Sequence, residues 1–565
     1  MNKRSFLFCC MFSWAIALSA QSPLLKQWDY RYGGTLGDFL KAVIKTSDHG
    51  LLMGGESQSD SSGDKSQNRV GAWNAPDLWI VKVDSLGIKQ WDKTYGGNRA
   101  VTFGALLELK DGGYLCGGGV TADSGYDVSE PNRGNVGSSD FWLLKLDLLG
   151  NKVWDRRFGG DGGEFLTSML EMHNGFVLLG RSSSGVSGDK SEPNWDQNLT
   201  TADYWILKVD FAGNKVWDKR YGGFLNDYPN KIIQTEEGGY IIAGNSWSHR
   251  EGDVTEEAYD TSSHLPDYWI VKIDSMGNKL WDKRYGGLGA EYFSSICTNS
   301  NNGFLVGGIS YSGISGVKAV ENHDSSLSSN TADFWVLEID RLGNIIWQKT
   351  YGGYANEDEF CDISRTADCG YLLSGTSYSH IGGDKSEENL GNEQSWFIKI
   401  DSVGNRVWDK TLRTNIGLGD NENGFAIQMS DFSYVMGNYT GGPSGGDKTQ
   451  DSQGGADYWI SKYVDINFIK CVETNGGDTL PIVDELLIFP NPVLSELTVK
   501  LTSVKLNSIS LNIYDVLGQV VYRFSDVNLS KSFTKVIDLS ALANGIYFLV
   551  IKVNDDQFIK KILKQ

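Results

Sequence analysis

Short apolar runs, each ended by a glycine turn, recur through most of this 565-residue chain. In one representative stretch the pattern predicts four strands, at 230–235, 240–244, 267–274 and 279–285. The third run is apolar on both faces, as expected for a strand that is covered on both sides. The fourth carries charges at its centre, which suits an outer edge that must not pair with other chains. We therefore predict four-stranded units, ordered from inside to outside as their strands follow in the chain.

Tryptophan marks the period of this pattern. Of the 18 tryptophans, fourteen form two columns that repeat every 61 to 66 residues. The column in the fourth strands is Trp28, Trp91, Trp154, Trp217, Trp281, Trp347 and Trp408. The column in the third strands is Trp79, Trp142, Trp205, Trp269, Trp335, Trp396 and Trp459. A fixed period of this length, filled with short strands and glycine turns, is typical of a β-propeller.

The two ends of the repeat region complement each other. The Trp28 strand has no third strand before it, and the last third strand, 458–465, has no fourth strand after it. The count closes if residues 25–32 supply the outer strand of the last unit, which removes two open sheet edges. The predicted fold is therefore all-β. It is a seven-bladed β-propeller over 21–465 that is closed by the N-terminal strand, followed by a linker over 466–484 and a small Ig-like β-sandwich over 485–565.

The repeat resembles a family of propeller repeats that is common in secreted bacterial proteins. Units of that family read roughly Trp-x-x-x-Tyr-Gly-Gly, then Asp-Gly-Gly-Tyr, then Asp-Tyr-Trp-x-x-Lys-x-Asp. The segments 217–223 and 267–274 match well, and the likeness covers about 25–465. This resemblance implies a fold and carries no defined reaction.

The last eighty or so residues contain a second set of motifs. A Pro-Asn-Pro segment opens it, Tyr-Asp-x-x-Gly and Gly-Ile-Tyr follow, and a lysine-rich strand closes it. In this order the motifs resemble the type A C-terminal sorting domain of the type IX secretion system of Bacteroidota. The resemblance implies that the secretion machinery is a partner and that the chain crosses the outer membrane, to be released or attached to surface lipopolysaccharide. The residues that carry it are Pro490, Asn491, Pro492, Gly518, Gly545, Tyr547, Lys560 and Lys561.

Residues 1–20 are predicted to be a signal peptide, because two basic residues precede a short apolar stretch and a small-residue cleavage site. No later run is apolar for eighteen residues, so we predict no transmembrane segment. The expected location is therefore the outer cell surface or the medium. The net charge of −20 argues against nucleic acid or an anionic lipid surface as a partner, since both require basic patches.

Long loops join the second to the third strand of each unit. They lie on the same face of a propeller as the connections between units, and ligand binding concentrates in such loops. Exposed aromatic side chains there would stack on sugar rings or anchor a protein, although they would serve equally to fasten the loops onto the blades. The loops are 58–76, 120–139, 181–202, 246–266, 310–332, 377–394 and 440–456. The candidate ligand-binding residues are Trp73, Trp195, Trp247, Tyr311 and Tyr378.

A Gly-Asp-Lys-Ser/Thr turn recurs in four of these loops, at 63–66, 188–191, 383–386 and 446–449. Aspartate and backbone carbonyls suit calcium. However, the alternating ligand pattern of a dedicated calcium loop is missing and a lysine sits beside the aspartate, so we favour an aspartate that hydrogen-bonds its own turn. We predict no cofactor and keep calcium as the alternative.

Five cysteines remain after the signal peptide, an odd number without the repeat period, so no disulfide framework is indicated. Cys361 and Cys369 flank one hairpin and could pair; the alternative is buried thiols. The sequence contains no Gly-x-Ser-x-Gly, His-Glu-x-x-His or phosphate-binding loop, and we predict no catalytic residues and no metal site.

The predicted function is therefore that of an exported, non-catalytic propeller that binds a polysaccharide or a protein through its long-loop face. Two alternatives stay open at this point. The chain could be a structural or adhesive surface module without a discrete ligand. It could also be a glycoside-active enzyme, which would need two carboxylates about 5–10 Å apart in a cleft.

Overall fold

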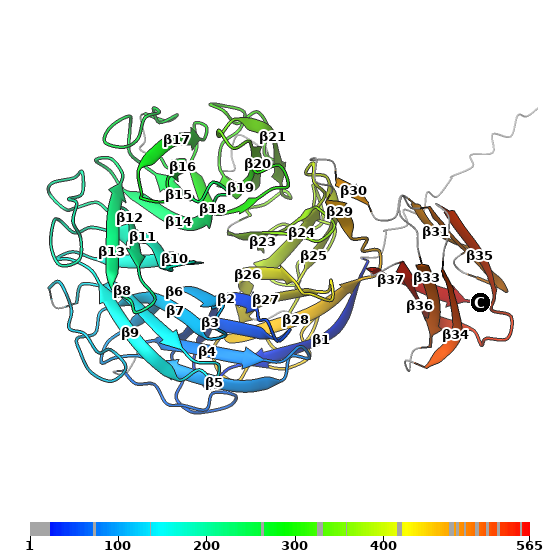
Figure 1. The fold of residues 1–565 in the computed structure, drawn as a ribbon. Helices are drawn as coiled ribbons and strands as arrows, with labels where there is room; N and C mark the ends of the chain where they lie inside the picture. Colours follow the sequence, from blue (N-terminus) through cyan, green and yellow to red (C-terminus); the bar gives the residue numbers. More distant parts are fainter. Residues whose placement is uncertain are drawn as a thin grey trace, which may run out of the picture.

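The computed structural model describes residues 23–71, 75–135, 137–261, 265–324, 331–357, 359–414, 421–473, 479–481, 485–490, 493–502, 508–515, 519–527, 532–553 and 556–565. The regular structure in these residues is entirely β (Figure 1), and they contain no helix that could span a membrane. The predicted signal peptide lies outside the described residues.

Residues 24–465 form seven four-stranded antiparallel sheets, here called sheets 1 to 7. Sheet 1 consists of β2 (Asp38–Lys45), β3 (Leu51–Ser57), β4 (Asp77–Val83) and β5 (Lys89–Tyr95). Sheet 2 consists of β6 (Val101–Glu108), β7 (Tyr114–Val120), β8 (Asp140–Leu146) and β9 (Lys152–Phe158). Sheet 3 consists of β10 (Glu164–Met172), β11 (Gly175–Ser182), β12 (Asp203–Val209) and β13 (Lys215–Tyr221). Sheet 4 consists of β14 (Asp227–Gln234), β15 (Tyr240–Ser246), β16 (Asp267–Ile273) and β17 (Lys279–Tyr285).

Sheet 5 consists of β18 (Glu291–Thr298), β19 (Phe304–Ser310), β20 (Asp333–Ile339) and β21 (Ile345–Tyr351). Sheet 6 consists of β22 (Phe360–Arg365), β23 (Tyr371–Ser377), β24 (Gln394–Ile400) and β25 (Arg406–Thr411). Sheet 7 consists of β26 (Asn421–Gln428), β27 (Tyr434–Thr440), β28 (Asp457–Asp465) and β1 (Leu24–Tyr32). Strand β1 pairs antiparallel with β28, from Leu24 opposite Asp465 to Tyr32 opposite Tyr458. The N-terminal strand therefore completes the last sheet, as the count of strands in the sequence predicted.

The sheets are arranged radially, with their first strands toward the middle and their fourth strands outside (Figure 1). The first strands of all seven sheets line one cavity of about 600 Å³. This arrangement confirms the predicted order of the strands within each unit, and it places a central channel along the inner edges of the sheets.

The two tryptophan columns lie on opposite faces of each sheet. In sheet 4, Trp281 lies directly opposite Lys272 and therefore shares its face. Lys272 is three residues from Trp269, and because side chains alternate along a strand, Trp269 points to the other face. Trp269 packs on Tyr204 of sheet 3 with ring centroids 4.8 Å apart, whereas Trp281 packs into the core between sheets 4 and 5. Seven buried clusters follow this rule, each with a third-strand tryptophan of one sheet and a fourth-strand tryptophan of the preceding sheet.

Each third-strand tryptophan also donates its indole N–H to a polar residue on the fourth strand of the same sheet. The distances are 3.0 to 3.2 Å. The pairs are Trp79–Asp92, Trp142–Asp155, Trp205–Asp218, Trp269–Asp282, Trp335–Gln348, Trp396–Asp409 and Trp459–Asp29. In the last pair the acceptor comes from the other end of the chain, so this bond holds β1 in sheet 7.

Sheets 7 and 1 pack in the same manner as sheets that follow each other in the chain. The ring of Tyr458 lies 4.8 Å from that of Trp79, and its hydroxyl donates to the carbonyl of Trp79 at 3.1 Å. Tyr204 makes the same hydrogen bond to Trp269 between sheets 3 and 4. The contact between the first and last sheets therefore uses the same residue types at the same positions as the contact between sheets 3 and 4.

A tyrosine at the end of the fourth strand fastens five of the contacts between sheets. Its hydroxyl donates to the carbonyl of the turn glycine in the following sheet. Phe158 and Leu412 replace it after sheets 2 and 6. The pairs are Tyr32–Gly87, Tyr95–Gly150, Tyr221–Gly277, Tyr285–Gly343 and Tyr351–Gly404.

A disulfide joins sheet 6 to the segment that follows sheet 7 in the chain. Cys369, in the turn between β22 and β23, is bonded to Cys471 at the start of β29 (Cys471–Glu473). Asp465 also accepts the indole N–H of Trp408 at 3.0 Å. The pairing of Cys361 with Cys369, which the sequence left open, does not form, because the partner of Cys369 is 102 residues away in sequence; the expectation of buried thiols is wrong for Cys369 and Cys471. Cys361 is a free thiol.

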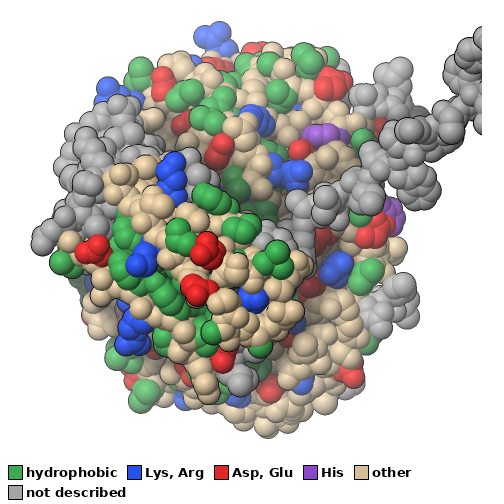
Figure 2. Space-filling model, turned by 90° about the vertical axis from the view of Figure 1, so that its right-hand side faces the viewer, with side chains coloured by type: hydrophobic (Ala, Val, Ile, Leu, Met, Phe, Trp, Pro, Cys, Tyr) green, Lys and Arg blue, Asp and Glu red, His purple; other side chains and the backbone are tan. Residues whose placement is uncertain are grey.

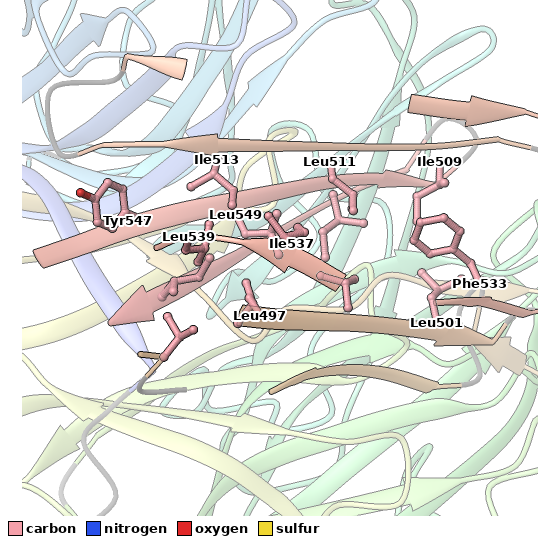
Figure 3. Packing of buried hydrophobic residues seen from close by; sticks show 14 of the residues in the cluster. Leu497, Leu501, Ile509, Leu511, Ile513, Phe533, Ile537, Leu539, Tyr547 and Leu549 are labelled. Atoms are coloured by element: carbon pink, nitrogen blue, oxygen red, sulfur yellow. The ribbon is translucent and has the colours of Figure 1, made fainter. Parts of the chain in front are cut away.

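The C-terminal residues form a β-sandwich. One sheet consists of β31 (Glu485–Phe489), β32 (Glu496–Thr502) and β35 (Ser532–Asp538). The other consists of β34 (Val520–Val527), β33 (Ser508–Tyr514), β36 (Gly545–Val553) and β37 (Asp556–Lys564). Side chains from both sheets, among them Leu497, Ile537, Leu511 and Leu549, point into a common core (Figure 3). A short hairpin, β29 with β30 (Thr479–Pro481), lies in the segment predicted to be a linker.

We expect Asp29→Ala to lower the stability of the chain by about 2–4 kcal/mol. The carboxylate is 7% exposed and accepts hydrogen bonds from the indole of Trp459, the backbone N–H of Thr449 and the ammonium of Lys26. The substitution leaves the indole of Trp459 and the N–H of Thr449 without this acceptor and loosens the outer strand of sheet 7. The urea midpoint at pH 7 measures the effect. Gln27→Ala, at an exposed position of the same strand, is the matched control, and equal midpoints for the two variants would contradict this role of Asp29.

Candidate ligand-binding face

The loops between second and third strands lie at the same end of the sheets as the connections between sheets. This end is here called the long-loop face. The opposite end carries turns of a few residues, such as the one from Asp274 to Asn278, in which the aspartate accepts backbone N–H groups. The opposite face also carries cavities, lined by short turns, of which one of about 610 Å³ includes Arg365 and Phe432. The long loops themselves lie on the long-loop face.

The Gly-Asp-Lys turns fasten each loop to the preceding sheet. Asp189 accepts the backbone N–H of Gly159, at the end of sheet 2, at 3.2 Å. Asp447 accepts that of Arg413, at the end of sheet 6, at 3.0 Å. The aspartate therefore bonds a neighbouring sheet rather than its own turn, which corrects the turn interpretation of the motif. Asp64 and Asp384 make the same contact.

The lysine of the motif is buried under its loop. Lys190 donates to the carbonyl of Ser184 at 2.8 Å, and Lys448 donates to that of Gly442 at 2.6 Å. Burial lowers the pKa of Lys65, Lys385 and Lys448 to about 8. In the described part of the chain no three His, Cys, Asp or Glu residues are grouped as metal ligands. The motif thus has a structural role, and calcium binding at these loops stays untested.

Pairs of buried carboxyl groups lie where the strands of adjacent sheets begin. Asp203, at the start of β12, faces Asp227, at the start of β14, and both are fully buried. Burial raises the pKa of Asp227 to about 7, and burial together with the charge of Asp227 raises that of Asp203. Burial also raises the pKa of Glu357, near Asp333, to about 8. Other pairs are Asp267 with Glu291 and Asp457 with Asp38.

These pairs lie between sheets rather than in a cleft. One oxygen of Asp203, of Asp227 and of Glu357 has no hydrogen-bond partner within the described residues, as expected for carboxyl groups that hold a proton at neutral pH. A polymer cannot reach them without separating the sheets. They therefore do not supply the carboxylate pair that a glycoside-active enzyme would need, and that hypothesis has no specific support from them.

The candidate Trp195 connects two loops. Its indole N–H donates to Asp253 of the next loop at 2.9 Å, and Arg220 lies 4.8 Å above its ring. At the equivalent position in other loops, Arg133 reaches Asp189 and His323 reaches Asp384, both at 3.1 Å. Hydrogen bonds to Asp333 and Asp384 raise the pKa of His323 to about 10, so this contact is an ion pair at neutral pH. Trp195 is thus one of a set of latches between loops.

The candidates Trp247 and Tyr311 lie together. The ring of Trp247 is 5.2 Å from that of Tyr228 and 6.4 Å from that of Tyr292, which is 6.4 Å from Tyr311. Tyr378 occupies the equivalent position in sheet 6, where its hydroxyl donates to Glu393 at 3.1 Å. Trp73 lies outside the described residues. The structure therefore brings together two of the five candidates.

The sequence reasoning missed four members of this group. The guanidinium of Arg181 lies 4.6 Å from the ring of Phe165 and 4.3 Å from that of Tyr228. Phe165, Tyr228 and Tyr292 each occupy the second position of a first strand, where sheet 1 has Phe39. That recurrence was the available signal. The aromatic arc is defined here as Phe165, Arg181, Tyr228, Trp247, Tyr292 and Tyr311, and it crosses sheets 3, 4 and 5.

The arc borders the mouth of the central channel. Tyr292 is 38% exposed, Phe165 is 36% exposed, and the other members are half-buried. Tyr292 also lines a cavity of about 460 Å³ together with Lys41, Asn230, Asn245 and Glu359. Deeper in the channel, Lys231 of sheet 4 pairs with Asp362 of sheet 6 at 3.2 Å, which narrows the passage below the mouth. The long-loop face thus combines an aromatic surface with a polar depression.

The residues of the predicted sorting motif lie in the C-terminal sandwich. Gly545 begins β36, and Tyr547 is buried with its hydroxyl donating to the carbonyl of Ala543 at 2.9 Å. Lys560 pairs with Leu549 across β36 and β37, and Pro490 directly follows β31. Asn491, Pro492 and Gly518 lie outside the described residues, as does the side chain of Lys561.

On the side of the molecule drawn in Figure 2, acidic and basic side chains are interspersed.

Comparison with known families identifies the C-terminal part. Residues 487–565 match the model of the secretion system C-terminal sorting domain. The type IX system delivers a chain that carries this domain to the cell surface or the extracellular space. The predicted location is confirmed, and the secretion machinery is a partner of the C-terminal sandwich.

Similarities to the rest of the chain are weaker. The regulatory protein FlaEY of Caulobacter vibrioides is 25% identical over 168 residues, which are 30% of this chain and 18% of that protein. A solved protein of unknown function from Dyadobacter fermentans aligns with a TM-score of 0.40 and 13% identity, over 78% of this chain and 99% of that one. Streptogramin B lyase aligns with a TM-score of 0.36 and 10% identity, over 76% and 97% of the two chains. Similarities of this size carry no argument about activity.

We expect the melting temperature to fall as the pH rises from 5 to 8. Carboxyl groups whose pKa is raised in the folded chain contribute stability below their unfolded pKa, and that stability is lost as the pH rises through the folded pKa of about 7 to 8. The buried lysines, whose pKa is lowered to about 8, do not oppose this fall in stability. Their contribution to the free energy of unfolding changes with pH only above pH 8. Differential scanning fluorimetry across this range measures the slope.

Asp227→Asn removes one of the titrating groups and should flatten the slope, whereas Glu236→Gln, at an exposed turn, should leave it unchanged. A melting temperature that rises through pH 5 to 8, or an unchanged slope in Asp227→Asn, would contradict the assignment.

Proposed function

We propose that this chain is a seven-bladed β-propeller, closed by its N-terminal strand, which a Bacteroidota cell exports by the type IX route. We further propose that it binds a polysaccharide or a protein through its long-loop face and catalyses no reaction. The pairing of β1 with β28 and the packing of Trp28 and Trp79 in one cluster support closure of the ring. Closure covers the faces of the first and last sheets, and the charged fourth strands protect the outer edges that remain, which suits a protein outside the cell.

The aromatic arc is the observation that carries the binding proposal. Its rings are partly exposed and contiguous over three sheets, and Tyr292 connects them to the polar cavity at the channel mouth. Sugar rings present C–H groups that pack on aromatic faces and hydroxyls that hydrogen-bond to polar side chains of the cavity such as Lys41 and Asn230. A protein ligand would use the same surface through apolar anchors and backbone groups.

The latches between loops favour the second candidate, a structural or adhesive module. Arg133, Trp195 and His323 each hold one loop to the next, so the long-loop face is stiff without any ligand. A stiff face that binds no specific ligand would suit a structural component of the cell surface. The two candidates differ in whether substitutions in the arc change binding.

Binding of the purified chain to a polysaccharide panel, combined with capture of partners from an outer-membrane extract, tests the proposal. We expect Trp247→Ala to weaken binding about tenfold or more while leaving the melting temperature nearly unchanged, because its ring is half-buried in the arc.

Trp195→Ala is the matched control. It removes the same kind of side chain from the same face but from a latch, so we expect it to lower the melting temperature and retain the affinity. No binding in either assay, or equal loss of affinity in both variants, would contradict the proposal and favour the structural module. We expect EDTA to leave binding unchanged, and a loss that calcium restores would instead support the cation hypothesis.

Export supplies a further test. We expect a chain that ends at residue 484 to accumulate in the periplasm, because it lacks the sorting domain, whereas the full chain reaches the surface or the medium. Cell fractionation distinguishes these locations. Delivery of the truncated chain to the surface would show that another segment directs export.

A further inference from the structure

The aromatic arc contains a cation that differs from six other arginines at this end of the sheets. Arg31, Arg133, Arg157, Arg220, Arg284 and Arg413 each form an ion pair with an aspartate. Arg181 instead stacks on two rings, and within the described residues no carboxylate or carbonyl accepts a hydrogen bond from it. In a chain with a net charge of −20 and many carboxylates, such a cation requires an explanation.

The neighbouring sheet provides a structural reason. Arg181 is the second-to-last residue of β11. In two other sheets the equivalent side chain accepts a hydrogen bond from a backbone N–H of the next sheet. Glu56 accepts the backbone N–H of Phe103 at 2.9 Å, and Asn245 accepts that of Phe293 at 2.5 Å. In sheet 4 the residue equivalent to Phe103 and Phe293 is Pro229, as the strand registers show.

Proline has no backbone N–H, so the contact from sheet 3 to sheet 4 needs no acceptor at position 181. Pro229 lies on a first strand, whose inner edge faces the channel, and it therefore removes no bond from the sheet. The ring of sheets does not require Arg181 for this contact. Its side chain is free to lie between Phe165 and Tyr228.

Stacking uses the faces of a guanidinium and leaves its in-plane N–H groups for an acceptor. These donors match carboxylates and sulfates in two-bond geometry. The carboxylates near the channel mouth do not satisfy Arg181, since Glu56 and Glu359 accept backbone N–H groups of Phe103 and Asn423. A second cation, Lys41, lines the cavity beside Tyr292. Both cations lie beside rings that would pack against sugars.

Building on the proposed function, we infer that the aromatic arc binds an acidic polysaccharide, with Arg181 pairing with a carboxylate or sulfate of the polymer while Tyr228, Trp247 and Tyr292 pack against its sugar rings. The net negative charge of the chain repels such a polymer at long range. Recognition therefore depends on the direct contact with Arg181 and weakens with added salt.

Two pairs of polymers test the inference with the full chain. Polygalacturonate is compared with its methyl ester, and dextran sulfate with dextran, so each pair shares a backbone and differs in charge. We expect the chain to bind the charged member of at least one pair and to bind its neutral partner about tenfold more weakly or not at all. The pair that responds tells whether the acidic group is a carboxylate or a sulfate.

The variants locate the contact. We expect Arg181→Gln to reduce binding of the charged polymer about tenfold and Arg181→Lys to reduce it less, because lysine keeps the charge and loses the planar stack. Arg341→Gln makes the same change of charge at an exposed turn of the opposite face and should have no effect. Equal effects of Arg181→Gln and Arg341→Gln, or binding that Arg181→Gln does not change, would overturn the inference.

The outcomes separate this inference from the proposed function. Equal binding of a neutral polymer, or capture of a protein or an oligonucleotide, each lost in Trp247→Ala, would overturn the acidic ligand and leave a binding arc in place. The absence of any binding in wild type would overturn both. Melting temperatures of all the variants identify any that fail to fold, and Arg181→Lys, the milder change, then decides the result.

Discussion

The hydrogen bond from a third-strand indole to a fourth-strand acceptor is the constraint on which the sheets depend. It fixes the fourth strand against the third and turns the tryptophan toward the preceding sheet, where its ring fills the core. The acceptor also takes a backbone N–H from the overlying loop, as Asp282 does from Thr255. In sheet 5 the acceptor is Gln348, which receives both the indole of Trp335 and the N–H of Ala319. The interaction therefore needs an oxygen at this position, while the negative charge is dispensable.

The sequence was sufficient to predict the sheets, the order of their strands and the use of the N-terminal strand in sheet 7, because each follows from counting a regular period. The faces of the two tryptophans could not be predicted. Each hairpin between a third and a fourth strand contains a register shift, which in sheet 4 lies between Lys272 and Ile273. A shift of one residue moves a side chain to the other face of the sheet. The pairing of Cys369 with Cys471 could not be predicted either, since it joins parts of the chain that only the packing of sheets 6 and 7 brings together.

The candidate site was only partly accessible to sequence reasoning. Trp195 and Trp247 look alike as loop tryptophans, yet the first precedes a third strand and the second follows a second strand. Position within the repeat separates them, because Arg133 and His323 share the place of Trp195, whereas Tyr311 and Tyr378 share that of Trp247. Tyr228 and Tyr292 belong to strands, where aromatic residues are expected to be core, so their partial exposure became evident only in the folded chain.

In a repeat protein, equivalent positions of the repeats can be compared to distinguish structural residues from residues with another role. Positions that carry the same chemistry in most sheets serve the ring, as the indole acceptors and the strand-end tyrosines do. Where one sheet has a different residue at such a position, the packing of the sheets alone does not explain that residue. Leu412 is one such departure, and a disulfide ties the β22–β23 turn of the same sheet to the segment after β28. Arg181 is another, because Pro229 removes the N–H that an acceptor at this position would serve. The first departure lies at the contact between sheets 6 and 7, whereas the second leaves a cation among aromatic rings at the channel mouth, where no carboxylate or carbonyl of the described residues accepts a hydrogen bond from it.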